Sequence, residues 1–458
     1  MTTQLIAIGI FIAVFAVAAK RNVNIGIVMF PFAAVVGLWL ADLALEDVVA
    51  GFPLSILVLL VGVTYFFGIA HTNGTIGWLI DAAISRVGER DRLFPLVFFT
   101  LSAIISAMGA PLGALIVAPV GMTVAKRRGI DPMLMALAMG CGLSAGAFAP
   151  TSLFGIITWG TAESAGIDLS PMLLFSLALA MNVALLAVSY VIFGRRGAGP
   201  TVDGSSPTPQ TAPQDDHNQH TGRSLGEYGQ STLQLTQQRV TVEDTAATTA
   251  SPRPSGIQVL TMVCMVALVG SIAVLSVLDK DPDIGVLGFA FAALLAVLDP
   301  GPGKSAMTRI DWGSVLLVGG IITYVGVLTK LGVLDMLGEQ AANLGTPLVA
   351  AFLLCAAAGL ISAFASTTGM LAALVPLSLP LIEHGGIPGW ALICAIGVCA
   401  SIVDVSPFST VGATYVATSE EVDRARMTKL LTRWGLSMVV VGPVVLTLVL
   451  IIPGMVAA

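Results

Sequence analysis

Charged residues are scarce in this chain, because Asp, Glu, Lys and Arg together make up only 10% of its 458 residues. A soluble domain carries about 25%, so this chain cannot cover a water-facing surface. The scarcity excludes a soluble enzyme, and the net charge of −6 also excludes a nucleic-acid-binding protein. What the chain has instead is 56% hydrophobic residues and 49 glycines. This composition predicts a helical integral membrane protein, in which small residues let helices approach closely.

Metal-binding and disulfide patterns are also lacking. The five cysteines all lie in apolar stretches and none has C-x-x-C spacing, which predicts small buried hydrophobes. No H-E-x-x-H motif occurs. No basic residue precedes Leu5, whereas a signal peptide begins with a positive region. We therefore expect the first apolar stretch to remain as a membrane helix.

Apolar stretches long enough to be membrane helices recur along the chain, since a bilayer core needs about 20 apolar residues. The candidate spans are 5–19, 25–40, 54–70, 132–158, 171–193, 257–277, 284–298, 315–328, 390–416 and 430–452. Regions 96–124 and 347–381 are long enough for two short arms each, around centres that contain Gly, Ser, Thr or Pro. They predict two re-entrant hairpins.

Residues 197–254 differ from the rest because they are rich in Ser, Thr, Gln, Pro and Asp. Such a segment cannot bury enough apolar surface to fold. It predicts a disordered cytoplasmic linker between a first membrane repeat, 1–196, and a second, 255–458.

The two membrane regions match each other at a nearly constant offset of 256 to 258 residues. The matches include ISA at 105–107 and 361–363, Pro119 with Pro376, Pro150 with Pro407, Ser152 with Ser409, and Gly155 with Gly412. Weak internal symmetry of this kind is typical of membrane transporters.

Basic residues set the expected orientation, because cytoplasmic loops collect Lys and Arg. If both ends of the chain lie outside, all of the 21 Lys and Arg except Lys280 and Lys330 fall inside. Each region then has five crossings, an odd number, so the second repeat is inverted. We expect a multi-pass protein of the cell inner (plasma) membrane, all-α, with two inverted repeats. Each repeat has five crossings, one re-entrant hairpin and one broken helix.

Two spans are interrupted at equivalent places, in GLSAGAFAPTSLFG (Gly142–Gly155) and ASIVDVSPFSTVG (Ala400–Gly412). Proline breaks a helix interior but suits a first position. Each helix should therefore stop and restart at Pro150 or Pro407, with Ser406 as N-cap of the second restart. Two restarted helices and two hairpin arms present four N-termini, worth roughly +2 in charge if all converge. That charge suits a small dianion without any buried Lys or Arg.

Asp404 is the one acid that these spans place near the middle of the membrane. A charge there costs roughly 2.5–3.5 kcal/mol. Its equivalent in the first repeat is Ala147, so the symmetry of the fold does not require it. Two interpretations stay open: a group that couples transport to a proton or cation, or a cap for the restarted helix.

The first 190 residues resemble the MatC-type malonate/dicarboxylate carriers. The resemblance is carried by NVNIGIVMF (Asn22–Phe30), LVGVTYFFGIAHTNGTIGWL (Leu60–Leu79) and GCGLSAGAFAPTSLFGII (Gly140–Ile157). The whole chain resembles the broader ion transporter superfamily, which includes the divalent anion:sodium symporters. The resemblance implies inverted repeats, re-entrant hairpins, broken helices and a homodimer.

In those symporters each hairpin tip carries Ser-Asn-Thr, which binds substrate carboxylate and sodium. The corresponding residues here are Ser366-Thr367-Thr368, close to that pattern, and Gly109-Ala110-Pro111, which departs from it fully. The departure weakens a sodium site at the first tip, so the resemblance leaves Na⁺ or H⁺ as coupling ion.

The sequence thus predicts a secondary transporter of a small dicarboxylate, malonate-like or C4, working by alternating access in a lipid bilayer, with no enzyme activity and no cofactor. The expected substrate-binding residues are Gly109, Ala110, Thr151, Ser152, Ser366, Thr367, Thr368, Ser406, Ser409 and Thr410, with Asp404 for coupling. One alternative is a cation/proton antiporter of the same superfamily. A remote one is an intramembrane hydrolase using Ser144 of GLSAG, which fits G-x-S-x-G but lies in an apolar helix.

Overall fold

The protein is helical throughout the part that its structure, a computed structural model, describes. The described residues are 2–21, 23–85, 91–109, 111–194, 253–277, 283–333, 336, 347–363 and 367–457. Within these ranges no strand occurs, which confirms the all-α prediction. Residues 195–252 lie outside them, so the linker at 197–254 stays a prediction.

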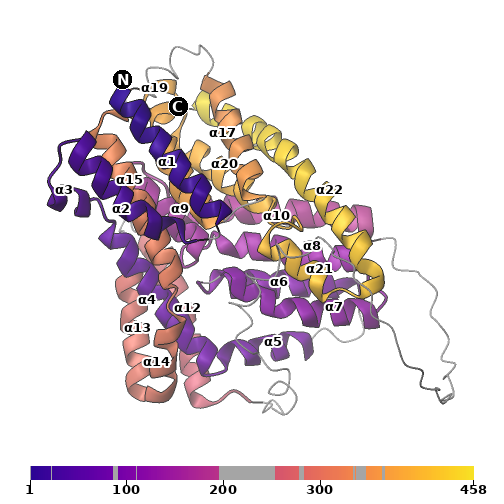
Figure 1. The fold of residues 1–458 in the computed structure, drawn as a ribbon. Helices are drawn as coiled ribbons and strands as arrows, with labels where there is room; N and C mark the ends of the chain where they lie inside the picture. Colours follow the sequence, from indigo (N-terminus) through magenta and orange to yellow (C-terminus); the bar gives the residue numbers. More distant parts are fainter. Residues whose placement is uncertain are drawn as a thin grey trace, which may run out of the picture. The chain divides into compact units, whose positions relative to one another are not determined.

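The chain up to residue 194 forms ten α-helices and two short 3₁₀-helices in the described residues (Figure 1). They are α1 (Thr2–Lys20), α2 (Ile25–Leu40), α3 (Leu45–Val49), α4 (Leu54–Thr72), α5 (Thr75–Ser85), η1 (Asp91–Leu93), α6 (Phe94–Ala107), η2 (Pro111–Val117), α7 (Ala118–Arg127), α8 (Pro132–Ala147), α9 (Leu153–Ser164) and α10 (Pro171–Phe193). Helices α3 and α5 lie between the predicted spans and were not expected from the sequence.

The chain after residue 252 continues with a similar succession of helices. They are α12 (Gly256–Val277), α13 (Ile284–Leu298), α14 (Pro300–Ala306), η3 (Met307–Arg309), α15 (Trp312–Lys330), α17 (Pro347–Ser362), α18 (Thr367–Leu377), α19 (Leu379–Gly385), α20 (Gly389–Ile402), α21 (Thr410–Thr418), α22 (Glu421–Leu446), the π-helix η4 (Thr447–Ile451) and α23 (Ile452–Ala457). The two predicted hairpin regions correspond to α6 with η2 and α7, and to α17 with α18.

Several of these helices have the length and apolarity of membrane spans. Four in the described residues are long enough to cross a bilayer: Leu54–Thr72, Pro171–Phe193, Trp312–Lys330 and Glu421–Val456. Eight further apolar helices have 10–17 residues. These helices fit a helical membrane protein, while the predicted ten crossings and the re-entrant hairpins stay predictions.

One group of helices is built on two close crossings, α2 with α15 and α4 with α13. At the first crossing, a Cβ added to Gly26 would lie closer than 3.0 Å to the Leu316 carbonyl oxygen, and one added to Gly320 equally close to the Gly26 carbonyl. At the second crossing, a Cβ added to Gly62 would lie closer than 3.0 Å to the Gly285 carbonyl oxygen, and one added to Gly285 equally close to the Leu59 backbone. Glycine is needed at each position because backbone occupies the space of a side chain.

A second group of helices packs around α8 and α20, which are buried along almost their whole lengths. Helices α6 and α10 contact α8, and α17 and α22 contact α20. Both predicted interruptions are present, since α8 is followed by α9 after a five-residue break and α20 by α21 after a longer one. The core therefore surrounds the two broken helices.

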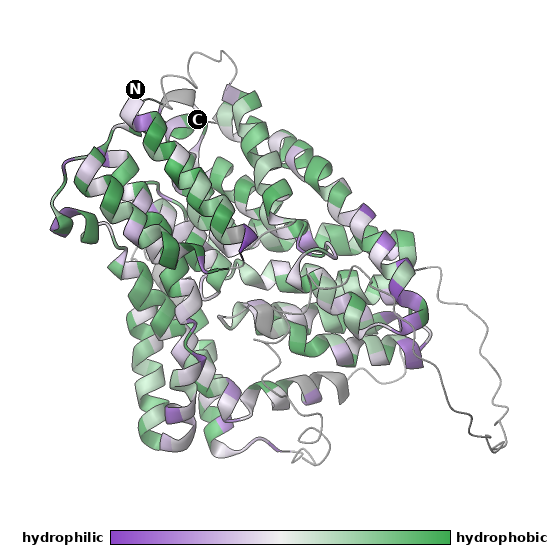
Figure 2. Ribbon diagram, in the orientation of Figure 1, coloured by the Kyte–Doolittle hydropathy of each residue, from purple (hydrophilic) through white to green (hydrophobic). Residues whose placement is uncertain are grey.

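Hydrophilic residues gather at helix ends, while hydrophobic residues follow most helix lengths (Figure 2). Such a cluster lies where α7 ends and α22 begins. Lys126 pairs with Glu420, and the Arg426 guanidinium lies 2.7 Å from the buried Asp131 carboxylate. Asp131 also caps α8 by accepting from the Met133 N–H at 2.9 Å. These ion pairs join the end of α7 and the start of α8 to the first part of α22.

Overpacking usually costs about 1–3 kcal/mol. Alanine at Gly26 should destabilise the protein by about 3 kcal/mol or more, because the added methyl group meets backbone. Alanine at Gly9 of α1 is the control, since nothing lies within 4 Å of its added Cβ. That change should leave stability unchanged or raise it by about 0.5–1 kcal/mol. Chemical unfolding in detergent measures both. Equal effects of the two substitutions would contradict the close crossing.

Candidate functional site

Gly109 ends the first arm of the first hairpin in a backbone conformation that favours glycine, with φ of 100°. A Cβ there would lie 3.1 Å from Phe67 and 3.3 Å from Val63, both on α4. Glycine is thus favoured at position 109 both by the backbone φ and by the closeness of α4. The next residue, Ala110, lies outside the described residues, and its predicted role stays a prediction.

Hydroxyl groups join the first hairpin to the first break. The Thr151 hydroxyl donates to the Ala107 carbonyl at 2.6 Å, and the Ser152 hydroxyl donates to the Ser106 carbonyl at 2.7 Å. The Ser106 hydroxyl in turn donates to the Leu143 carbonyl of α8 at 2.7 Å. We call Ser106, Ala107, Thr151 and Ser152 the first cluster. Two of its acceptors, the Ser106 and Ala107 carbonyls, lie in the last turn of α6, where a helix end leaves carbonyls without helical partners.

A carboxylate takes the corresponding position in the second half. Asp404, only 4% exposed, accepts from the Thr367 hydroxyl at 2.6 Å and from the Ser362 hydroxyl at 3.2 Å. These two hydroxyls lie 2.7 Å apart. We call Ser362, Thr367 and Asp404 the second cluster. It ties the end of α17 and the start of α18, the two hairpin arms, to the break after α20.

The second restart is capped by Ser409. Its hydroxyl accepts from the Gly412 N–H at 3.2 Å and donates to the carbonyls of Asp404 and Ser406. The predicted N-cap at Ser406 is therefore wrong by one turn, because Pro407 lies in the turn and α21 begins only at Thr410. The first restart likewise begins at Leu153, with Ser152 as N-cap.

The remaining predicted residues lie in different surroundings. Thr368 is buried beside the second cluster, and Ser406 is buried against Gly435 of α22. Thr410 is exposed and takes no part in either cluster. Ser366 lies outside the described residues, so its role stays a prediction.

Sequence reasoning missed Ser106 and Ser362 as site residues. Both belong to the ISA segments that match at an offset of 256 residues. The match was a signal of the repeat, but nothing in it distinguished a hydroxyl that reaches another segment from one that bonds within its own helix.

The two broken helices contact each other through residues at equivalent positions. The Ser144 hydroxyl of α8 donates to the Ser401 carbonyl of α20 at 3.1 Å. A Cβ on Gly140 would meet Val405 within 3.0 Å, and one on Gly397 would lie 3.0 Å from Phe148. The two glycine contacts are reciprocal, because an offset of 257 residues converts one into the other.

The charge of this region comes from Asp404 and from helix ends. Asp404 is the only Asp, Glu, His, Lys or Arg in segments 96–124, 132–158, 347–381 and 390–416. No group of three or more metal-binding side chains occurs among the described residues. Of the four predicted helix N-termini, those of α9, α18 and α21 are α-helical, whereas Gly109 is followed by the 3₁₀-helix η2. The α-helical ends supply roughly +1.5 in charge if they converge.

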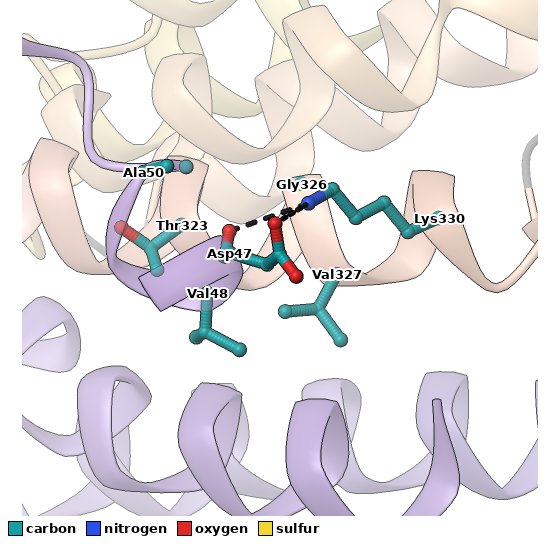
Figure 3. Close-up of a pocket in the computed structure, with 8 residues that line it drawn as sticks. Asp47, Val48, Ala50, Thr323, Gly326, Val327 and Lys330 are labelled. Carbon is teal, nitrogen blue, oxygen red and sulfur yellow. Dashed lines mark hydrogen bonds and ion pairs between the residues drawn. The ribbon is translucent and has the colours of Figure 1, made fainter. Parts of the chain in front are cut away.

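A separate pocket of about 140 Å³ lies between α3 and α15 (Figure 3). Lys330 spans it, with its Nζ 3.6 Å from the Asp47 carboxylate, and Val48 and Val327 line its apolar side. Both charged side chains are about half exposed, so the pair contributes little stability. None of the predicted site residues lines this pocket.

Comparison with known families finds a match to the first third of the chain. Residues 1–147 match the family described as "Dicarboxylate carrier protein MatC N-terminus". This confirms the resemblance to the MatC-type carriers, and it supports a dicarboxylate carrier rather than an enzyme. The match includes α1 to α8 with the first hairpin and ends before the first break. No curated protein matches the chain.

Valine at Thr367 should lower the free energy of unfolding by about 1.5–3 kcal/mol, because it removes a hydrogen bond to a buried carboxyl group. The matched control is valine at Thr368, which is buried next to it but outside the second cluster. Chemical unfolding in detergent compares the two. An equal or larger loss for the Thr368 variant would contradict the arrangement of the cluster.

Proposed function

We propose, from the match of residues 1–147 to the MatC carrier family, that this chain is a secondary active transporter of a small dicarboxylate. Malonate is the first candidate substrate, and C4-dicarboxylates are the second. The family match is the observation that carries the proposal. The geometry around the two breaks supports it, because it supplies polar groups within an otherwise apolar bundle.

The proposed binding site is formed by the hairpin tips and the two breaks. Hydroxyls and backbone N–H groups at helix N-termini recognise carboxylates without a formal positive charge. The hairpins and broken helices contain no Lys or Arg, so these groups would bind the dianion. The proposed residues are Gly109, Ala110, Thr151, Ser152, Ser366, Thr367, Thr368, Ser406, Ser409 and Thr410. Thr410, being exposed, would contribute through its backbone.

Two inverted repeats with alternating access form part of the same proposal. The reciprocal glycine contacts of α8 with α20 support it, as do the matching crossings of α2 with α15 and of α13 with α4. Transporters built from inverted repeats bind substrate at the repeat interface and expose it to each side in turn. In this chain that interface would contain both breaks.

The surroundings of the carrier follow from the distribution of basic residues and from the family. We propose a homodimer in the bacterial-type inner membrane, with both ends of the chain outside and the linker in the cytoplasm. The family resemblance is the reason for the dimer. The excess of Lys and Arg in the expected cytoplasmic loops is the reason for the orientation.

Asp404 would couple transport to a proton or cation. It is buried, lies at a break, and contacts both arms of the second hairpin. A change of its charge would therefore alter the contacts of the hairpin tip directly. The alternative role that the sequence left open, a side-chain cap for α21, is taken by Ser409.

Purified protein in liposomes should take up labelled malonate with saturable kinetics, and unlabelled succinate should compete. The expected driving force is an inward gradient of protons or of sodium, applied separately. Liposomes without protein are the control. Folded protein that takes up no malonate under either gradient would contradict the proposed function.

Alanine at Asp404 should abolish gradient-driven uptake and spare exchange of internal for external malonate, because exchange needs no net movement of the coupling ion. Both fluxes are measured in the same liposomes. If gradient-driven uptake survives unchanged, Asp404 is not the coupling group.

A cation/proton antiporter is the second candidate function, and the buried Asp404 is the observation that favours it. An antiporter should dissipate a pH gradient on addition of sodium with no organic acid present. A hydrolase has weaker support, because the Ser144 hydroxyl is buried and donates to the Ser401 carbonyl. A serine-reactive probe should therefore leave Ser144 unlabelled.

A further inference from the structure

The two hairpins are joined to their breaks by different chemistry. In the first cluster, three hydroxyls donate to three backbone carbonyls. In the second cluster, two hydroxyls donate to one carboxyl group. Ser106 and Ser362 are equivalent residues, so the same serine bonds a carbonyl in one half and a carboxylate in the other.

Two positions that carry different residues, and one serine that has different partners in the two halves, account for this difference. Ala147 of the first half corresponds to Asp404, which brings the carboxylate. Thr151 corresponds to Phe408, so the second half lacks the hydroxyl that reaches Ala107 in the first. Ser152 corresponds to Ser409, whose hydroxyl caps its own helix instead of reaching the hairpin. Asp404 thus replaces both hydroxyls as the link between hairpin and break.

Only the second cluster can change its charge. Segments 96–124 and 132–158, which form the first hairpin and the first broken helix, contain no Asp, Glu, His, Lys or Arg. Hydroxyl-to-carbonyl bonds persist over the physiological pH range, since neither partner titrates there. A carboxylate accepts from both hydroxyls, whereas a carboxylic acid donates one bond and keeps less acceptor capacity. Adding one proton therefore changes the hydrogen bonds that hold the second hairpin to its break. The hydrogen bonds of the first hairpin stay unchanged.

We infer that coupling runs through the second hairpin alone, with Asp404 carrying a single proton for each dicarboxylate dianion. This inference rests on the proposed transport function and specifies its coupling. The proton adds to a carboxylate oxygen of Asp404 and forms one O–H bond, so the site goes from −1 to neutral and releases the proton to the other side. No further reactant is needed.

A proton fits the second cluster better than a metal cation. Its three oxygens already lie 2.6, 2.7 and 3.2 Å from one another, at hydrogen-bond distances. A metal ion between them would have to spread all three. A proton neutralises the Asp404 carboxylate without moving these oxygens apart.

Of the helices packed around Asp404, α17, α20 and α21 carry only buried thiols and a buried phenol, α18 carries no titratable group, and α22 carries the charged residues. Helix α17 carries Cys355, α20 carries Cys394 and Cys399, and α21 carries Tyr415, all of them buried, while α18 carries none. Helix α22 carries Glu421, Asp423, Arg424, Arg426, Lys429 and Arg433. The last of these, Arg433, is exposed and lies two residues before the glycine that packs on Ser406. Ion pairs with Asp404 are absent from the part of the chain that the structure describes. Protonation of Asp404 itself is therefore what changes the charge of the second cluster.

The stoichiometry is tested in liposomes at a pH where malonate is a dianion. With one proton per dianion, each transport cycle moves one net negative charge across the membrane. Each 100 mV of inside-positive potential should then raise the equilibrium malonate ratio about 50-fold, and each unit of inward pH gradient about tenfold. A response of about a hundredfold per pH unit with no effect of potential would indicate two protons and overturn the inference.

Accumulation driven by sodium without a pH gradient would also overturn this inference, while leaving the transport function in place. Absence of malonate flux under every gradient, exchange included, would instead remove the proposed function itself. The two failures are therefore distinguishable in one set of liposomes.

Equivalent serines provide the matched variants. Ser362→Ala removes one donor to the Asp404 carboxylate, so the midpoint of the pH dependence of exchange should move up by about 1–2 units. Ser106→Ala removes a donor to a carbonyl, and the midpoint should stay where it is. Asp404→Asn, which keeps the shape and fixes the charge at zero, should make exchange independent of pH. Equal shifts for the two serine variants, or a pH-dependent Asp404→Asn protein, would overturn the assignment.

Discussion

The interruption of two buried helices is the constraint on which the rest of this structure depends. Each break leaves backbone carbonyls and N–H groups without helical partners inside an apolar bundle, where an unsatisfied polar group costs several kcal/mol. At the second break the Ser409 hydroxyl bonds backbone groups of the break and of the restarted helix, and at the first break Thr151 and Ser152 bond the carbonyls that end α6. These hydroxyls reach the hairpins or cap the restarted helix. Satisfying the breaks therefore also determines what contacts the hairpin tips.

Close helix packing provides the frame for these contacts. Glycines at the crossings of α2 with α15 and of α4 with α13 let backbones touch, which positions α4 against the tip at Gly109. Between the broken helices, Gly140 and Gly397 instead make room for the side chains of Val405 and Phe148. Small residues are a general means of association in an apolar solvent, where burial of apolar side chains gives no driving force between helices. The high glycine content first indicated a membrane protein. A few of these glycines have a clear role, because they allow close packing at the helix crossings.

Much of this arrangement could be predicted from the sequence, because proline and apolar run length are local signals. They located both interruptions, both two-armed regions and Asp404. The restart positions were placed too early, because a proline can lie in the turn before a helix as well as at its first residue. The partners of Asp404 could not be predicted, since a serine in an apolar helix usually bonds its own preceding turn. Only the three-dimensional fold shows that Ser362 bonds a distant carboxylate and Ser106 a neighbouring helix.

The central claim is that this bundle binds a dianion through hydroxyls and backbone N–H groups, with no basic side chain in the hairpins or broken helices. Calorimetric titration of the purified protein with malonate and with its monomethyl ester tests this most directly. The account predicts saturable binding of malonate and at least tenfold weaker binding of the ester, because one carboxylate has lost its charge. Absence of malonate binding, or equal affinity for the two compounds, would contradict it.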